Sequence, residues 1–177
     1  ALERYPQLFE AAVLSAPMCA TQTGKYPRFA ARLLAEFCCL AGKGKCFATL
    51  AGQQGFSEAP QFEGSSCLSR ERYDYMFQKR LLEEHYRTYG GSYAGVRAGF
   101  RASRELMRRE NLAKIKVPVL LFAAGCDHMV DNGAIGRFAE ETERTKLFSM
   151  PDSRHEIFNA DERTRVKYLS LIHISEP

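Results

Sequence analysis

The stretch that most constrains the fold of this chain is residues 117–131, VPVLLFAAGCDHMVD. Its first eight residues are all apolar, and Gly125 then ends the run. A short apolar run bounded by turn signals is typical of a strand buried on both faces, as in a parallel sheet covered by helices. Asp127 follows directly, at the carboxyl end of the predicted strand, where open α/β sheets place their functional groups.

Strands and helices alternate on both sides of this stretch. Residues 132–142 predict a helix, residues 145–150 a second strand, and a final helix begins at residue 160. Residues 9–15 predict one more short strand near the start of the chain. Strand–helix–strand–helix with short loops favours a right-handed unit of parallel strands. The predicted fold class is therefore α/β, with a parallel sheet.

The middle of the chain, residues 18–112, has a different character. Helical spacing of apolar residues predicts helices over 28–40, 69–86 and 92–109. A glycine- and serine-punctuated loop, residues 42–69, separates the first two, and loops of this length are often lids or binding loops. We interpret this block as a mostly helical insertion, or cap, in an α/β domain.

The predicted organisation has four parts. Residues 1–17 and 113–169 belong to the α/β core, and residues 18–112 form the cap or lid. Residues 170–177, SLIHISEP, form an atypical tail that we do not expect to continue the amphipathic final helix.

Composition excludes several classes of protein. The formal net charge of +4 does not suggest a nucleic-acid-binding protein. No apolar run approaches the roughly 20 residues of a membrane span, and the first residues do not resemble a signal peptide. The six cysteines lack a CxxC pair and zinc-finger spacing, and the four histidines lack i, i+4 pairing. We therefore expect free or structural thiols in a reducing compartment, no metal and no cofactor.

Asp127 and His155 are the candidate catalytic residues. Each follows its own predicted strand, and parallel neighbouring strands would bring both loops to one sheet edge, within hydrogen-bond reach. A carboxylate that fixes the tautomer of an imidazole is the supporting half of a nucleophile–histidine–acid triad. Taken singly, an aspartate in a loop often caps a turn and a histidine is often structural. Their joint placement favours catalysis.

A nucleophilic serine is the missing part of this triad. No G-x-S-x-G string occurs in the 177 residues. The nearest match, around Ser92, follows a charged helix rather than the buried strand that a nucleophile elbow requires. Ser15 follows a strand but has no flanking glycine. We reject both, and expect the serine and the oxyanion donors outside this sequence.

Two strings, KVPVLLFAAGCDHMVDN and MPDSRHEIFNADERTR, resemble the C-terminal part of the α/β-hydrolase superfamily. The resemblance is to bacterial lysophospholipases and monoacylglycerol-lipase-like proteins, with their P-V-L-L-x-x-G-x-D-x-V-V and G-x-x-H-E-I-x-x-E-x-D-x-x-R motifs. Asp127 and His155 fall on the acid and the base. Glu156, Ile157 and Arg165 match positions that cap and pack the histidine loop. In the cap, SRERYDYMF and GGSYAGVRAGFRAS also resemble this group, although the cap lacks the group's tryptophan.

The resemblance implies a serine-hydrolase-type carboxylic ester hydrolase of lipid metabolism, most like a lysophospholipase that releases a fatty acid through an acyl-serine intermediate. It implies a lipid or small ester substrate and a cytoplasmic location, with peripheral contact to the inner membrane as an option. As given, the chain would be a C-terminal fragment without activity. The alternatives are an inactive fragment that serves as a partner surface, a monoacylglycerol lipase, a proline-type aminopeptidase or another esterase.

Two features of the cap region leave alternatives open. Six aromatic residues predict either the apolar wall of an acyl pocket or ordinary core. The basic run over residues 101–116 predicts either contact with anionic headgroups or a solvated helix face. The six aromatic residues are Phe29, Phe37, Phe56, Phe62, Tyr73 and Phe77.

Overall fold

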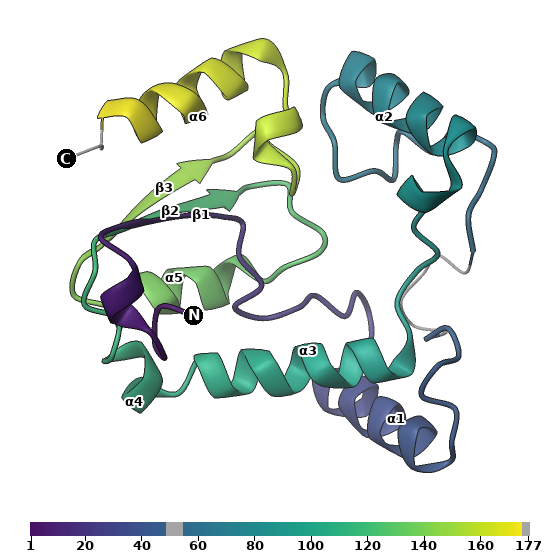
Figure 1. Ribbon diagram of the computed structural model, residues 1–177, viewed down its shortest axis with the longest axis horizontal. Helices are drawn as coiled ribbons and strands as arrows, with labels where there is room; N and C mark the ends of the chain where they lie inside the picture. Colours follow the sequence, from purple (N-terminus) through teal and green to yellow (C-terminus); the bar gives the residue numbers. More distant parts are fainter. Residues whose placement is uncertain (49–54, 175–177) are drawn as a thin grey trace. The chain divides into compact units, whose positions relative to one another are not determined.

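A sheet of three parallel strands organises the computed structural model, which describes residues 1–48 and 55–174. The strands are β1 (Ala12–Ser15), β2 (Val119–Ala124) and β3 (Thr145–Met150), side by side in the order β1-β2-β3 (Figure 1). Every residue of the central strand β2 is buried. The predicted parallel α/β arrangement and its doubly buried strand are therefore confirmed.

The register of the sheet explains where the first strand begins. Ala12 pairs with Val119, and the N–H of Ala12 donates to the carbonyl of Pro118 at 2.9 Å. Proline has no N–H to offer a neighbouring strand, so the pairing cannot extend further back along β2 as a regular ladder. The predicted strand over residues 9–15 is thus three residues too long at its start, and a 3-10 turn, η1 (Pro6–Leu8), precedes it.

Helices α5 (Asn132–Glu140) and α6 (Glu162–Ile174) cover opposite faces of the sheet (Figure 1). Helix α5 begins where Asp131 accepts a hydrogen bond from the N–H of Gly133 at 2.8 Å, a typical N-cap. Helix α6 packs the ring of Tyr168 edge-on against the fully buried Phe122 of β2, with 4.6 Å between ring centroids. These contacts make the sheet a core with helices on both sides.

The final helix extends further than its sequence pattern predicts. It is capped by Asp161, and hydrogen bonds from Thr164 lower the pKa of the Asp161 carboxyl below its ordinary value. The helix then continues to Ile174, and Leu171 and Ile172 pack against the core. The expectation that the helix does not enter the tail is therefore wrong for residues 170–174, because tertiary packing sustains it there. The remaining tail residues, 175–177, lie outside the described part.

The chain divides into two compact units. Unit 1 contains the sheet and consists of Ala1–Gln22, Phe62–Tyr73 and Ser103–Pro177. Unit 2 consists of Thr23–Gln61 and Asp74–Ala102. Residues 62–73, which lie in the middle of the predicted cap, therefore belong with the sheet. The predicted cap boundaries at residues 18 and 112 stay a prediction.

Helices dominate the middle of the chain, as predicted. Helix α1 (Arg28–Leu40) has the expected bounds, and α2 (Arg70–Leu82) ends four residues early, before the short 3-10 turn η2 (Glu84–Tyr86). The third predicted helix is interrupted: α3 (Tyr93–Leu106) and α4 (Arg109–Leu112) are separated because Arg108 has an extended backbone, with ψ of 133°.

The aromatic residues of the predicted cap do not share one environment. Phe29 and Phe37 on α1 are 65% and 68% exposed, while Tyr73 and Phe77 on α2 are buried. The ring of Phe77 stacks on that of Phe56. Core packing therefore accounts for Tyr73 and Phe77, but not for the exposed Phe29 and Phe37. Within the described residues, no helix has the length and apolar composition needed to cross a membrane.

Cys19 gives a pH-dependent test of the core. All six cysteines are free, and Cys19 is fully buried, which raises the pKa of its thiol from 9.0 to about 11. The thiol ionises at a lower pH in the unfolded chain than in the folded one. The stability that the folded chain gains from the neutral thiol is therefore complete below about pH 8.5 and is lost as the pH rises toward 11. A two-unit shift corresponds to roughly 2–3 kcal/mol.

We expect Cys19→Ala to flatten the fall in unfolding free energy between about pH 8 and about pH 10.5, measured by urea denaturation. Cys126→Ala, at an exposed cysteine, should keep the wild-type dependence. Equal slopes for the wild type and Cys19→Ala would show that the Cys19 thiol contributes nothing.

Candidate active site

Asp127 and His155 meet at the carboxyl edge of the sheet. Asp127 lies in the loop after β2 and His155 in the loop after β3. Nδ1 of His155 is 2.8 Å from Oδ2 of Asp127. The structure thus brings together the two residues that the sequence singled out as candidates, although they are 28 positions apart.

Backbone hydrogen bonds join the two loops. Strands β2 and β3 end together, with Ala124 paired to Met150, and the N–H of Gly125 donates to the carbonyl of Met150 at 2.9 Å. The N–H of Cys126 donates to the carbonyl of Ser153, also at 2.9 Å. Ser153 is fully buried. Main-chain bonds therefore bring together the two loops that carry the acid and the histidine.

Both oxygens of the Asp127 carboxylate have partners. Oδ1 accepts the backbone N–H groups of Met129 at 2.7 Å and Val130 at 3.0 Å, which leaves Oδ2 for His155. The side chain of Asp127 is fully buried, and a buried charge is tolerated when its acceptors are satisfied in this way. The turn-capping role that a single loop aspartate suggests is therefore present together with the bond to the histidine.

The carboxylate determines the tautomer of the neutral imidazole. An ionised carboxylate only accepts hydrogen bonds, so Nδ1 of His155 carries the hydrogen and Nε2 is left with a free lone pair. The ring is 26% exposed, in contrast to the buried acid. The arrangement can take a proton at Nε2 while Asp127 stabilises the resulting charge.

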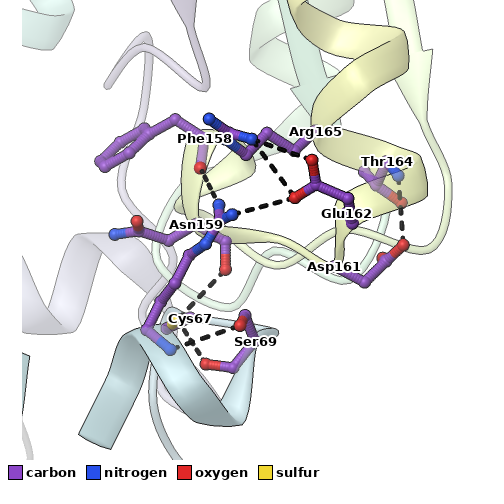
Figure 2. Close-up of polar contacts among 9 residues, drawn as sticks. Cys67, Ser69, Phe158, Asn159, Asp161, Glu162, Thr164 and Arg165 are labelled. Carbon is purple, nitrogen blue, oxygen red and sulfur yellow. Dashed lines mark hydrogen bonds and ion pairs between the residues drawn. The ribbon is translucent and has the colours of Figure 1, made fainter. Parts of the chain in front are cut away.

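The three further residues near the histidine behave differently from one another. Ile157 is fully buried in the core, and Glu156 binds the amide of Asn159 at 2.7 Å, so both support the histidine loop. Arg165 instead pairs with Glu162 on its own helix, at 3.1 Å (Figure 2). Its predicted role at the histidine loop is therefore not seen.

The two rejected serines have structural environments of their own. Ser92 accepts a hydrogen bond from the N–H of Gly95 at 3.1 Å and so caps the start of α3. The Ser15 hydroxyl is buried and has no hydrogen-bond partner among the described residues. The described ranges also hold no group of three or more histidine, cysteine and acidic residues placed to bind a metal.

Sequence reasoning missed the residues that bind the histidine loop from outside. Arg154 and Ser66 lie on either side of a contact between the loop after β3 and residues 62–69, which the sequence placed in a long loop. The partners of Arg154 are backbone carbonyls far away in the sequence, and no residue type marks them. The local sequence therefore shows only that an arginine lies next to His155.

The fold and the site together define an α/β-hydrolase. The model of the serine aminopeptidase S33 family matches residues 1–162, and the chain belongs to this family. Among curated protein sequences, none matches the chain.

Solved structures share the fold. Monoacylglycerol lipase from Paleococcus ferrophilus is similar with a TM-score of 0.68 and 21% identity, over 97% of this chain and 60% of that one. A soluble variant of monoglyceride lipase from Saccharomyces cerevisiae, in complex with a substrate analog, is similar with a TM-score of 0.61 and 11% identity, over 90% and 53%. The chain thus spans little more than half the length of these two proteins.

Gly125 gives a test of the junction between the two loops. A Cβ at this position would lie 2.2 Å from the carbonyl oxygen of Pro151, a backbone atom that can move only with its loop. We expect Gly125→Ala to force the loops apart, lower stability by about 1–3 kcal/mol or more, and break the bond between His155 and Asp127. Urea denaturation and the NMR signal of the His155 ring proton measure the two effects.

Gly136→Ala is the matched control, because a Cβ there meets nothing within 4 Å and the position lies inside α5. Replacing a helical glycine by alanine should leave stability unchanged or raise it by up to about 1 kcal/mol. If the two variants behave alike, the close approach at Gly125 does not hold the site together.

Proposed function

We propose that this chain supplies the general base, His155, and its orienting acid, Asp127, to a serine hydrolase that cleaves carboxylic esters. The observation that carries the proposal is the 2.8 Å contact between His155 Nδ1 and the buried Asp127 carboxylate. Membership of the serine aminopeptidase S33 family supports it, because this geometry matches the acid–histidine half of the hydrolase triad.

The proposed chemistry is acyl transfer in two steps. His155 takes the proton of the attacking serine at Nε2, and the serine oxygen adds to the ester carbonyl. The imidazolium then gives that proton to the departing alcohol, which leaves an acyl-serine. Water attacks the acyl-serine with the same histidine as base and releases the fatty acid. Asp127 holds the ring in the required tautomer and stabilises its charged form throughout.

The serine in this proposal lies outside the 177 residues. The sequence has no nucleophile-elbow motif, and both candidate serines fit other roles: Ser92 as a helix cap, and Ser15 as a buried hydroxyl without flanking glycine. The chain also spans 60% and 53% of the two lipase structures described above. We therefore infer that the activity belongs to a longer protein, and that the chain alone does not turn over esters.

For the substrate we propose a lipid with a single acyl chain. The motifs around Asp127 and His155 resemble those of lysophospholipases, which makes a lysophospholipid the first candidate. Monoacylglycerol is the second, favoured by the fold shared with two monoacylglycerol lipases. The two molecules share an acyl ester on glycerol and differ in the headgroup. A proline-type aminopeptidase or another esterase would use the same triad.

The exposed side of α1 supports contact with a lipid surface. Phe29, Leu33, Phe37 and Leu40 are each more than half exposed, although all are apolar. Arg28 and Arg32 on the same helix provide positive charge for anionic lipids. We propose on this basis that the enzyme touches a membrane surface peripherally, and the six free cysteines favour the cytoplasm, and so the inner membrane, as its place.

A fluorophosphonate probe tests the missing nucleophile in the 177-residue chain itself. We expect no covalent labelling, because the sequence has no nucleophile-elbow motif to present a serine to His155; intact-protein mass spectrometry measures the labelling. Stoichiometric labelling that is abolished in Ser15→Ala or Ser92→Ala would place the nucleophile inside this chain and overturn that part of the proposal.

Activity is tested in the longer protein that carries the nucleophile. His155→Ala and Asp127→Asn should each lower kcat by about 10⁴-fold, because they remove the base or its correct tautomer. His128→Ala, an exposed neighbour of Asp127, is the control and should keep near-normal turnover. Release of fatty acid from lysophosphatidylcholine, compared with 1-monoacylglycerol and a proline arylamide, separates the substrate classes. A near-normal rate in His155→Ala would reassign the base.

A further inference from the structure

A segment outside the sheet is fastened to the loop that carries His155. The segment is residues 62–72, here called the strap, and the loop is residues 154–159, here called the histidine loop. Both belong to unit 1. The contacts between them are made from both sides of His155, by Arg154 and by Glu156.

Arg154 holds the strap by its backbone. Its Nη1 donates to the carbonyls of Phe62 at 2.9 Å, Cys67 at 3.1 Å and Ser65 at 3.3 Å. The guanidinium also lies 5.4 Å from the centroid of the Phe62 ring, within the range of a cation–π contact. Three strap carbonyls thus share the Arg154 guanidinium as their donor. Replacing Arg154 by a residue without a donor would remove all three hydrogen bonds.

Glu156 holds the strap from the other side of His155. Its N–H donates to the carbonyl of Ser66 at 3.0 Å, and its Oε1 accepts the Ser66 hydroxyl at 2.5 Å. Its Oε2 accepts the Asn159 amide at 2.7 Å, which ties the strap to the end of the histidine loop. Hydrogen bonds to a charged acceptor are stronger than neutral ones.

The contact continues along the strap toward α2 (Figure 2). The buried thiol of Cys67 and the N–H of Ser69 both donate to the carbonyl of Asn159, at 3.2 Å and 3.1 Å. Arg72 donates to the carbonyl of Phe158 at 3.3 Å and pairs with Glu162 at 3.0 Å. The histidine loop is therefore bonded to the strap from Arg154 to its junction with α6.

We propose that Arg154 and Glu156 are positioning residues, which hold His155 in line with Asp127 by fastening the strap to the residues on either side of it. This inference rests on the proposed role of His155 as the base. Among the described residues, the ring has one side-chain hydrogen bond, to Asp127, and 26% of the ring is exposed, so its direction depends on the backbone that carries it. Bonds at the two neighbouring residues restrict rotation of that backbone.

The segment that contains the strap is connected to unit 2 at both ends, and the chain also passes between the units after Gln22 and after Ala102. Unit 2 ends one segment at Gln61, directly before Phe62, and resumes at Asp74, directly after Tyr73. If the strap contributed only to stability, weakening its bonds would leave the hydrogen bond between His155 and Asp127 unchanged.

The test uses the 177-residue chain and needs no turnover. The readout is exchange with water of the His155 Nδ1 proton, followed by NMR, with hydrogen exchange of the strap amides as the measure of its release. Arg154→Met removes the donors and keeps the stem, and Ser66→Ala removes one bond while the backbone bond to Glu156 remains. Arg108→Met is the matched control, because its guanidinium pairs with Glu105 and Glu110, which are not strap residues.

We expect Arg154→Met to speed exchange of the ring proton about tenfold and Ser66→Ala severalfold, while Arg108→Met leaves it unchanged. Arg154→Lys should restore most of the protection, since an ammonium group offers three donors to the same carbonyls. Thermal melts confirm that each variant is folded, and Ser66→Ala provides the test if Arg154→Met is not.

The proposal is overturned if the strap amides exchange faster in these variants while the ring proton keeps its wild-type rate. That result would leave the proposed function intact, because the His155–Asp127 bond would persist. Absence of a protected Nδ1 proton in the wild type would instead remove the observation on which the proposed function depends.

Discussion

The close approach of two backbone loops is the constraint on which the rest of the site depends. Gly125 lies against Pro151 at a distance that no side chain fits, and main-chain bonds from Gly125 and Cys126 then join the loop after β2 to the loop after β3. Because β2 and β3 also end in register, the loops that carry Asp127 and His155 lie at the same edge of the sheet, and the two side chains meet there. The 2.8 Å contact is a consequence of this junction.

Burial is divided unequally between the two partners, and the division suits a proton transfer. The Asp127 carboxylate is fully buried and satisfied by two backbone N–H groups, so it has little freedom to turn away. The His155 ring is partly exposed, as its proposed role in proton transfer requires. The acid is therefore held by its own loop, while the proposed support of the histidine comes from the strap, which is bonded to Arg154 and Glu156.

Where the sequence pattern was wrong about the fold, a contact distant in the chain decided the outcome. Residues 9–11 look like strand, yet the pairing begins at Ala12 because its partner strand is preceded by Pro118. Residues 170–174 look like part of an atypical tail, yet they are helical, and Leu171 and Ile172 pack against the core. Neither effect can be read from local spacing, since each depends on what lies opposite in the folded chain.

The sequence by itself determined the buried strand β2, the parallel α/β pattern, the family resemblance and the candidate pair Asp127 and His155. Each has a local signature in residue type and spacing. Only the tertiary structure decided how the histidine is held. The bonds from Arg154 reach carbonyls 87 to 92 positions away, and a backbone carbonyl has the same chemistry in every residue. No pattern of side chains marks such partners, so they become visible only once the chain is folded.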